Sequence, residues 1–344
     1  MTTLTIRPFA DRDLAACGAL LADAHRASVR REPAVPERFV EDGRGEAAVR
    51  HALLDTDADG AVAERGGRIV GFLGGTRSLT PPESFGAQYA PPRGASMPVA
   101  GHAVAEDESA IEVYRLLYAA LAERWAADGL FTHHVSMRPA DTAVRDAWFL
   151  LGFGARTVFA VRDTSPPREA TAERAPGIEV HAATAEEIDV VRHLDELESL
   201  HHRDSPIFWP HLGRDVAAAV EAFQRAALEG DRNPIFVATR DGEPVAMHFL
   251  LVEGGFGNRL STPDGAVYLY QAIVEPEARG GGVGTALLRH TLDWARTNGH
   301  DHITLHYGSA NPSGAPFWER QGFVPVEMTL ERVLDERIAW AKGR

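Results

Sequence analysis

The sequence is poor in cysteine and in long apolar runs, and each shortage excludes a class of protein. Cys17 is the only cysteine in 344 residues, so neither an intramolecular disulfide nor a cysteine-based zinc site can form within one chain. Its place near Leu14, Leu20 and Leu21, in an apolar helical pattern, favours a core residue over a nucleophile. No apolar run approaches the roughly 20 residues that a membrane span needs, so we expect no insertion into a membrane.

Basic residues are also in short supply: acidic residues outnumber them by 49 to 35, and the formal net charge is -14. A surface of this sign repels nucleic acid and anionic membranes at long range, so we expect neither as a partner. Residues 1–8 read as a strand and lack the pattern of a signal peptide, which predicts a cytoplasmic protein. The hydrophobic share of 44% and the charged share of 24% are typical of folded globular chains. We expect a monomer or a homodimer.

The second half of the chain repeats the pattern of the first. WFLLGF at 148–153 matches WERQGF at 318–323, an offset of 170 residues, and the same offset aligns residues 102–104 with 272–274. Near the start of each half the offset drifts to 174. Between the halves, residues 163–177 are rich in proline, alanine and charge, as linkers are. The length also suits two domains, and we predict domains at 1–163 and 178–344 with a linker at 164–177.

Hydrophobic periodicity predicts the same order of elements in both halves. In the second half, Asp241-Gly242 is a hairpin dipeptide between two apolar strands. Such a mixture of strands and helices predicts an α/β (α+β) domain with helices on both faces of a sheet. We predict strands at 178–181, 234–239, 245–252, 266–274, 302–307 and 325–332, and helices at 185–202, 214–229, 283–297 and 315–321.

A glycine-rich turn separates the predicted strand 266–274 from the predicted helix 283–297. Glycines let the backbone approach a phosphate closely, and successive N–H groups at a helix amino terminus attract anions. Thr285-Ala286 after Gly284 excludes a Walker A loop, and Leu287 stands where a dinucleotide fingerprint needs its third glycine. We predict that a pyrophosphate binds to Arg279, Gly280, Gly281, Gly282, Val283, Gly284 and Thr285.

The spacing Arg279-x-x-Gly282-x-Gly284 resembles the pyrophosphate signature of the GCN5-related N-acetyltransferases (GNAT). The resemblance extends upstream to the apolar strand with Val274 and downstream through Asn311 to the segment 317–323. It covers most of residues 178–344 in element order. It implies a mixed, mostly antiparallel, twisted sheet flanked by helices, acetyl-CoA or another acyl-CoA as co-substrate, and no metal.

In that family, the strand before the loop and the strand after the next helix splay apart, and the pantetheine arm lies between them. The resemblance therefore places the thioester carbonyl near the backbone N–H groups of Ile273 or Val274, which would act as oxyanion donors. It also places Asn311, Phe317 and Trp318 beside the cofactor arm. Asn311 is equally typical of a tight turn.

Many GNAT members use a tyrosine as general acid where this sequence has Trp318, and indole has no proton that titrates near neutral pH. Tyr307 is the best replacement and Ser313 the next, although Tyr307 also suits an ordinary strand position. The thiol could also leave as thiolate, because its pKa is about 8.5. The general base stays unassigned: Gln271 stands near where some relatives carry glutamate, and deprotonation through water remains open.

The acceptor pocket of this family forms partly from the first two helices and their connection, here residues 200–211. The adjacent His201 and His202 point to different helix faces and lack the spacing of helical zinc pairs, so the segment predicts either acceptor recognition or a solvated helix end. Asp204 and the nearby aromatic side chains suit a cationic amine. The predicted acceptor residues are His201, His202, Asp204, Phe208, Trp209, Tyr270 and His306.

The first half lacks the glycine loop, because Ser109, Ala110, Glu112 and Tyr114 stand where the second half has Arg279, Gly280, Gly282 and Gly284. We predict that it binds no coenzyme A and either walls the acceptor cleft or serves as a scaffold. Three functions follow for the whole chain: acyl transfer from acyl-CoA to a primary amine of a small molecule, acyl-CoA sensing or partner binding without catalysis, and acetylation of a protein amino terminus or lysine.

Overall fold

The computed structural model describes residues 3–41, 43–54, 56, 58–166, 177–210, 213–252, 255 and 257–340. Elements of the amino-terminal half follow the alternation of buried and exposed residues. In chain order they are β1 (Leu4–Pro8), α1 (Leu14–Arg31), α2 (Arg44–Leu53), β2 (Ala58–Arg65), β3 (Arg68–Leu79), β4 (Arg93–Met97), β5 (His102–Val104), α3 (Ala110–Ala127), β6 (Thr132–Met137), α4 (Thr142–Leu150) and β7 (Gly154–Asp163).

The carboxy-terminal half largely repeats this order, and the predicted helices and strands agree with it within two residues, with one exception. The helix predicted at 185–202 begins at Ile188, after a 3-10 turn at Ala185–Glu187, whereas the helix 283–297 has the predicted bounds. Asp241 and Gly242, with φ of 54° and 88°, form the predicted hairpin turn. The elements are β8 (Ile178–Ala182), α5 (Ile188–Arg203), α6 (Gly213–Glu229), β9 (Ile235–Arg240), β10 (Glu243–Leu251), β11 (Val267–Val274), α7 (Val283–Thr297), β12 (His302–Gly308), α8 (Gly314–Arg320) and β13 (Val324–Val333).

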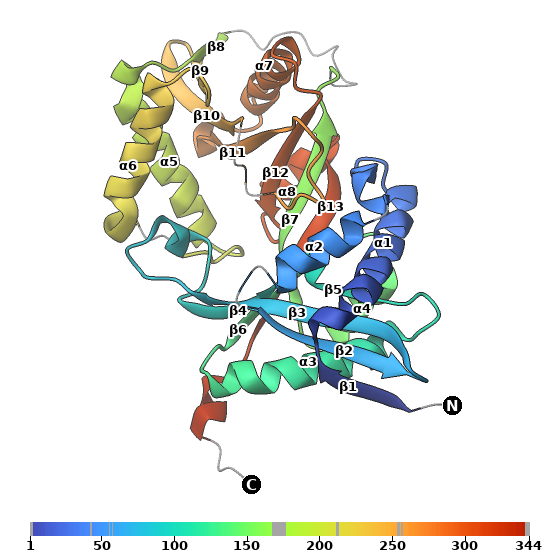
Figure 1. Cartoon of the computed structure of the whole chain (residues 1–344). Coiled ribbons are helices and arrows are strands. Elements are labelled where there is room, and N and C mark those ends of the chain that lie inside the picture. Colours follow the sequence, from blue (N-terminus) through green and yellow to red (C-terminus); the bar gives the residue numbers. More distant parts are fainter. Residues whose placement is uncertain are drawn as a thin grey trace.

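The strands of both halves join in one sheet, in the order β1-β2-β3-β4-β6-β13-β7-β12-β11-β10-β9-β8, with β5 paired to β3 off this path. Most neighbours are antiparallel, and the parallel pairs are β4–β6 and β11–β12. The predicted mixed, mostly antiparallel sheet is therefore confirmed. Figure 1 shows the sheet running through the molecule from β1 at the amino terminus to β8 at the opposite end.

The two halves exchange their last strands at the centre of the sheet. β7, from the first half, pairs with β12 of the second, and β13, from the second half, pairs with β6 of the first. β7 and β13 also pair with each other (Figure 1). Because each half completes the sheet of the other, we expect the two halves to unfold together. The linker predicted at 164–177 falls mainly on residues outside the described ranges, and the domain boundary stays a prediction.

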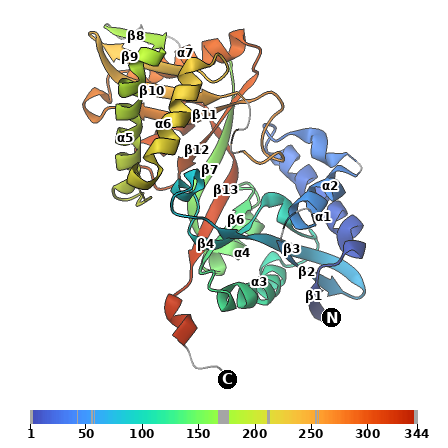
Figure 2. The ribbon, with the colours of Figure 1, turned by 60° about the vertical axis from the view of Figure 1, so that its left-hand side comes forward.

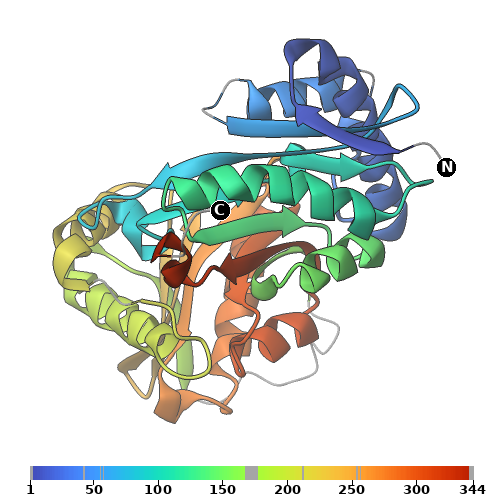
Figure 3. The same ribbon diagram turned by 90° about the horizontal axis from the view of Figure 1, so that it is seen from below.

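Helices cover both faces of the sheet and divide the core into four clusters. α7 and α8 cover β9–β12 on one face, and α5 and α6 lie side by side on the other (Figure 2). In the first half, α3 lies along the strands on one face (Figure 3), and α1 and α2 cover the other. Cys17 is fully buried among α1 and α2, as predicted, and burial raises the pKa of its thiol to about 12. Among the described residues, no helix is long and apolar enough to cross a membrane.

Candidate active site

A gap opens in the sheet where β11 and β12 diverge. The two strands pair only from Val267 to Leu269 and from Ile303 to Leu305, and beyond those residues they no longer share a ladder. A bulge at Tyr270 interrupts the pairing of β11 with β10 and re-aims the rest of β11. The splayed strands expected from the sequence resemblance are therefore present, and they end beside the amino terminus of α7.

The glycine loop forms the mouth of this gap. Gly280 and Gly282 have φ of 77° and 82°, values that residues with a Cβ rarely adopt. The N–H of Ala286 donates to the carbonyl of Gly282 at 2.9 Å and opens the hydrogen-bond ladder of α7. Gly282 is the amino-terminal cap of α7, and it has no side chain that could accept the N–H groups of the first turn of the helix. Those groups and the helix dipole form an anion site.

Two neighbouring side chains, Arg240 and Phe317, pack close to the loop. A Cβ at position 281 would lie 2.1 Å from Nη2 of Arg240, and one at position 284 would contact Phe317 at 3.4 Å. Arg240 donates to the carbonyl of Ala278 at 3.2 Å and braces the loop. Arg279 donates from Nε to the carbonyl of Val274 at 3.0 Å, so its exposed guanidinium stands at the rim. The loop thus has the open backbone and positive charge that a diphosphate requires.

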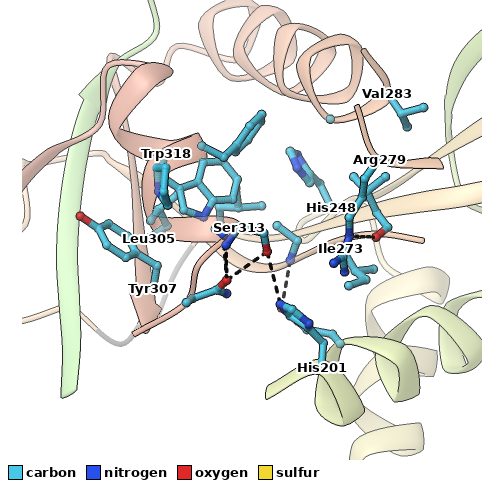
Figure 4. A pocket seen from close by; sticks show the side chains of 18 of the residues that line it. His201, His248, Ile273, Arg279, Val283, Leu305, Tyr307, Ser313 and Trp318 are labelled. Atoms are coloured by element: carbon cyan, nitrogen blue, oxygen red, sulfur yellow. Dashed lines mark hydrogen bonds between the residues drawn. The ribbon is translucent and has the colours of Figure 1, made fainter. Parts of the chain in front are cut away.

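The gap and the loop border a cavity of about 590 Å³. Figure 4 shows side chains from α5, β10, β11, β12, α7 and α8 converging on it. Gly281 is the one predicted residue of the loop that does not line the cavity. The predicted residues that do line it are His201, His202, Tyr270, Ile273, Val274, Arg279, Gly280, Gly282, Val283, Gly284, Thr285, His306, Tyr307, Asn311, Ser313, Phe317 and Trp318.

The hydrogen-bond ladder decides which amides of β11 face the gap. The N–H of Glu275 donates to the carbonyl of Val245 on β10 at 2.9 Å. In an antiparallel pair the bonded positions alternate, so the N–H of Ile273 turns towards β10. The N–H groups of Ala272 and Val274 turn towards the gap. Of the two predicted oxyanion donors, Val274 is therefore the one whose amide faces the cavity.

A carboxylate that the sequence reading did not single out lies at the centre of the site. Glu198 of α5 lines the cavity, and its Oε1 accepts the N–H of Ala272 at 3.3 Å. Burial, together with the negative charge of Asp195, raises the pKa of Glu198 to about 8. The signal was present in the sequence: Glu198 follows Val191 and Leu194 at helical spacing, so it shares the face of α5 that packs against the sheet.

Ser313 and His201 form a polar pair in the lining of the cavity. The hydroxyl of Ser313 lies 3.4 Å from Nε2 of His201 and 3.1 Å from Oδ1 of Asn311 (Figure 4). Asn311 also accepts the N–H of Gly314 at 2.8 Å, which starts α8. Asn311 therefore fills both roles left open by the sequence, since it shapes the turn and lines the cavity. Burial and the charge of Arg279 lower the pKa of His201.

Tyr307 lies against the cavity, but its hydroxyl points away from Ser313 and His201 (Figure 4). That hydroxyl donates to Oε1 of Glu319 at 3.4 Å, and burial raises the pKa of the phenol. Trp318 is 8% exposed and packs edge-on against Phe317 and Phe323. This position supports the predicted packing role of Trp318.

Two further imidazoles border the cavity, and burial keeps both neutral. Nδ1 of His306 shares a hydrogen bond with the hydroxyl of Tyr268 at 2.9 Å, and burial lowers the pKa of His306 to about 4. His248 of β10, which the sequence reading missed, bonds to Thr291 at 2.9 Å and has a pKa lowered to about 3. Groups with such low pKa values are weak proton acceptors, which leaves Glu198 as the better base.

The predicted acceptor segment lies partly outside the cavity. Asp204 is exposed and ion-paired with Arg203 at 3.5 Å, and Phe208 is 71% exposed. Trp209 packs behind the wall, with its ring 5.1 Å from that of His202. The structure therefore brings His201 and His202 into the site but not Asp204, Phe208 or Trp209, because α5 ends at Arg203 and the chain then turns outward.

The equivalent place in the first half is filled. α3 begins after Ser109, whose hydroxyl accepts the N–H of Glu112 at 3.4 Å, so a side chain caps the helix. The ring of Tyr114 is fully buried, and its hydroxyl bonds to Nδ1 of His102 at 2.8 Å. Arg138 stands where the second half has Gly308, and its buried guanidinium donates to the carbonyls of Leu260 and Val326. The cavity that remains measures about 50 Å³.

Comparison with known proteins agrees with this geometry. Residues 194–323 match the model of the acetyltransferase (GNAT) family. The chain is 27% identical over 101 residues to an uncharacterized N-acetyltransferase of Methanocaldococcus jannaschii, over 29% of this chain and 43% of that one. It is 32% identical over 101 residues to a mycothiol acetyltransferase of Acidothermus cellulolyticus, over 27% and 30%. The matched stretches thus span less than half the length of either relative.

A solved structure shares the fold over almost the whole chain. The GCN5-related N-acetyltransferase of Sphaerobacter thermophilus superposes with a TM-score of 0.58 at 15% identity, over 96% of this chain and 95% of that one. Residues 194–323 therefore resemble the acetyltransferase (GNAT) family, and the chain as a whole has the fold of this solved structure.

Proposed function

We propose that this chain is an N-acyltransferase that moves an acetyl or other short acyl group from acyl-CoA to a primary amine of a small molecule. The observation behind the proposal is one continuous cavity that runs from the bare amides at the start of α7 to a carboxylate with a raised pKa, Glu198. Its volume of about 590 Å³ lies in the range of small-molecule sites. A protein terminus or a lysine side chain is the less favoured acceptor.

The residues present fit coenzyme A. The amides of residues 280–285 and the guanidinium of Arg279 would hold the pyrophosphate, and Arg320, which also lines the cavity, adds a second cation. The arm would pass between β11 and β12 beside Asn311 and Phe317. When bound, acyl-CoA supplies a thioester carbon that an amine can attack. The N–H of Val274 faces the gap and would donate to the oxygen of that thioester as negative charge develops on it.

Glu198 is the proposed general base. Its carboxylate is bound to the N–H of Ala272, two residues from Val274, and two residues along a strand span roughly 6.6 Å. An ammonium acceptor would lose one proton to Glu198, directly or through one water. Its nitrogen then forms the amide bond as the bond from carbon to sulfur breaks, and the second proton that the nitrogen loses passes to solvent water. A base with a pKa near the working pH suits this task.

Ser313 is the proposed donor to the leaving sulfur. Its hydroxyl lies inside the cavity, where it donates to Oδ1 of Asn311 beside His201 and would turn this proton to the sulfur. The hydroxyl of Tyr307 instead points away from this pair and donates to Glu319. Because a thiol has a pKa of about 8.5, the sulfur needs only a hydrogen bond rather than full proton transfer. Tyr307 remains the second candidate for this role, as the sequence suggested.

The test is a thiol-release assay with purified full-length protein, acetyl-CoA and a panel of primary amines. We expect thiol release that depends on the amine and a matching acetylated product by mass spectrometry. Acceptor-independent release would indicate hydrolysis only. Tight coenzyme A binding by calorimetry without release for any amine would contradict the proposal and support an acyl-CoA sensor.

A further inference from the structure

The two halves also exchange loops, and the loops have opposite effects. The loop after β10 reaches into the first half, where Leu260 is 4% exposed within the core of α1 and α2. Ser261 of the same loop is fully buried, and its hydroxyl accepts a hydrogen bond from Nη1 of Arg138 at 2.8 Å. This loop therefore helps to fill the place that corresponds to the active site.

The matching loop after β3, residues 80–92, reaches in the other direction and leaves the active site open. The ring of Phe85 packs edge-on against Phe223 of α6 at 5.7 Å. The hydroxyl of Tyr89 bonds to the hydroxyl of Tyr270 at 2.5 Å, and Tyr270 lines the cavity. Figures 1 and 2 both show this loop beneath α5 and α6. An element of the first half thus touches the acceptor side of the site.

Negative charge and aromatic surface meet at this contact. Asp195 and Glu198 project from α5, and the negative charges of both act on the phenols of Tyr89 and Tyr270. The side-chain nitrogen of Gln271 of β11 donates to Asp195. The residue is only 9% exposed, and its side-chain oxygen Oε1 is buried without a hydrogen-bond partner. The other titratable groups that face this point are Tyr268 of β11 and His306 of β12, which are bonded to each other and neutral.

We propose that Tyr89 completes the acceptor site from the amino-terminal half, and that this site selects compact cationic amines without a carboxylate. This inference rests on the proposed function and names its acceptor class. The ammonium group would lie towards Glu198, and the apolar body of the amine would pack against Tyr270, which lines the cavity, and against Tyr89, which is bonded to it. A carboxylate beside the amine would be repelled by Asp195, and also by Glu198 in its ionised form.

Tyramine and tyrosine form a matched pair of probes, because they share the amine and the phenol and differ in one carboxylate. With the full-length enzyme, we expect kcat/KM for tyramine to exceed that for tyrosine by tenfold or more. Asp195→Asn should narrow this ratio at least threefold. Equal use of the two amines would overturn the inference while leaving the proposed function intact.

Tyr89→Ala should raise the KM for tyramine at least fivefold and leave the KM for acetyl-CoA within twofold. Tyr89→Phe, which removes only the hydroxyl, provides a variant that keeps the packing if the alanine protein is unstable. Leu79→Ala, at an exposed position just before the loop, is the control and should change neither constant. An unchanged tyramine KM in both Tyr89 variants would contradict the role of this loop.

Calorimetry with tyramine and the coenzyme A complex separates the two proposals. If tyramine binds more weakly to Tyr89→Ala than to the wild type but no amine is turned over, the result would support the acceptor site and contradict the proposed acyltransferase activity. If amines are turned over but tyramine binds equally well to Tyr89→Ala and the wild type, the result would support the acyltransferase activity and contradict the role of Tyr89 in the acceptor site.

Discussion

The two halves of this chain fold alike and differ most clearly at the start of the helix after the central strand. In the second half, α7 begins with Gly282 at φ 82° and presents bare amides to a cavity of about 590 Å³. In the first half, α3 begins with a side-chain cap from Ser109, and the ring of Tyr114 helps to reduce the cavity to about 50 Å³. The comparison teaches that the fold needs only the strands and helices, whereas binding needs side chains to be absent from a few positions.

The difference extends to the acidic side of the site. α1 and α5 each follow a short 3-10 turn, and an offset of 174 residues aligns them, so that Ala24 stands where Glu198 does. Ala24 and Asp141 border the small cavity of the first half, as Glu198 and Asn311 border the large one. The first half therefore lacks the carboxylate as well as the anion site.

The largest expected effect comes from giving the second half the residue of the first. Gly282→Glu should weaken coenzyme A binding by about 100-fold or more, because a carboxylate about 4 Å from a phosphate costs about 4 kcal/mol in a partly polar site. Gly299→Glu is the matched control, since Gly299 has φ 81° and open space around it but lies at the other end of α7. Calorimetry checks both variants, and equal affinity would refute the anion site.

Glu198→Gln should lower kcat/KM by about 100-fold, which is typical for loss of a general base. Because the pKa of Glu198 is raised to about 8, the carboxylate form increases as pH rises, and the wild-type rate should rise through pH 8 and level off above it. The variant should lack this limb. The acceptor for this measurement must have an amine pKa well below 8, so that its own titration does not mimic the limb.

Arg138→Met should destabilise the protein by about 3 kcal/mol, because it leaves the buried Glu327 without its cation. Glu327 accepts a hydrogen bond from the hydroxyl of Ser261, and that hydroxyl accepts one from the guanidinium of Arg138. The three side chains therefore connect the end of β6, β13 and the loop after β10. Thermal unfolding measures the loss, and the double variant with Glu327→Gln should recover part of it.

The pH dependence of that loss has a definite sign. Burial raises the pKa of Glu327 in the folded state, and removal of Arg138 raises it further. An acid whose pKa is raised by folding costs no stability below its unfolded pKa and progressively more as pH rises above it. The destabilisation by Arg138→Met should therefore be larger at pH 8 than at pH 5. An equal loss at both values would indicate that packing alone is involved.

Ser313→Ala has the smallest expected effect. Loss of one hydrogen bond of about 1 kcal/mol to the leaving sulfur corresponds to about fivefold in kcat. The first half already has alanine at the equivalent position, Ala143. Tyr307→Phe is the comparison variant and should change kcat by less than twofold, because its hydroxyl is directed to Glu319. If Tyr307→Phe lowers kcat more than Ser313→Ala does, Tyr307 rather than Ser313 is the donor to the leaving sulfur.

Local patterns predicted much of the site. The glycine loop, the helix 283–297 and the closed first half all follow from residues near one another in the chain, since turn geometry and helical periodicity are local properties. The diverging strands were expected from the family resemblance alone. The aromatic residues around Asp204 favour it as an acidic acceptor group, and no local motif singles out Glu198. Only the end of α5 at Arg203 turns Asp204 outward, while helical spacing turns Glu198 towards β11.

The sequence by itself determined the element order, the repeat and the anion loop, because these depend on contacts within a turn or a helix. Three features depend on the tertiary structure. β7 pairs with β12 of the second half and β13 with β6 of the first. Ser261 and Arg138 fill the site position of the first half, and Tyr89 contacts Tyr270 in the cavity of the second. These contacts join residues more than a hundred positions apart, and no spacing along the chain specifies which partner strand or loop is nearest. Packing of the whole sheet selects among them.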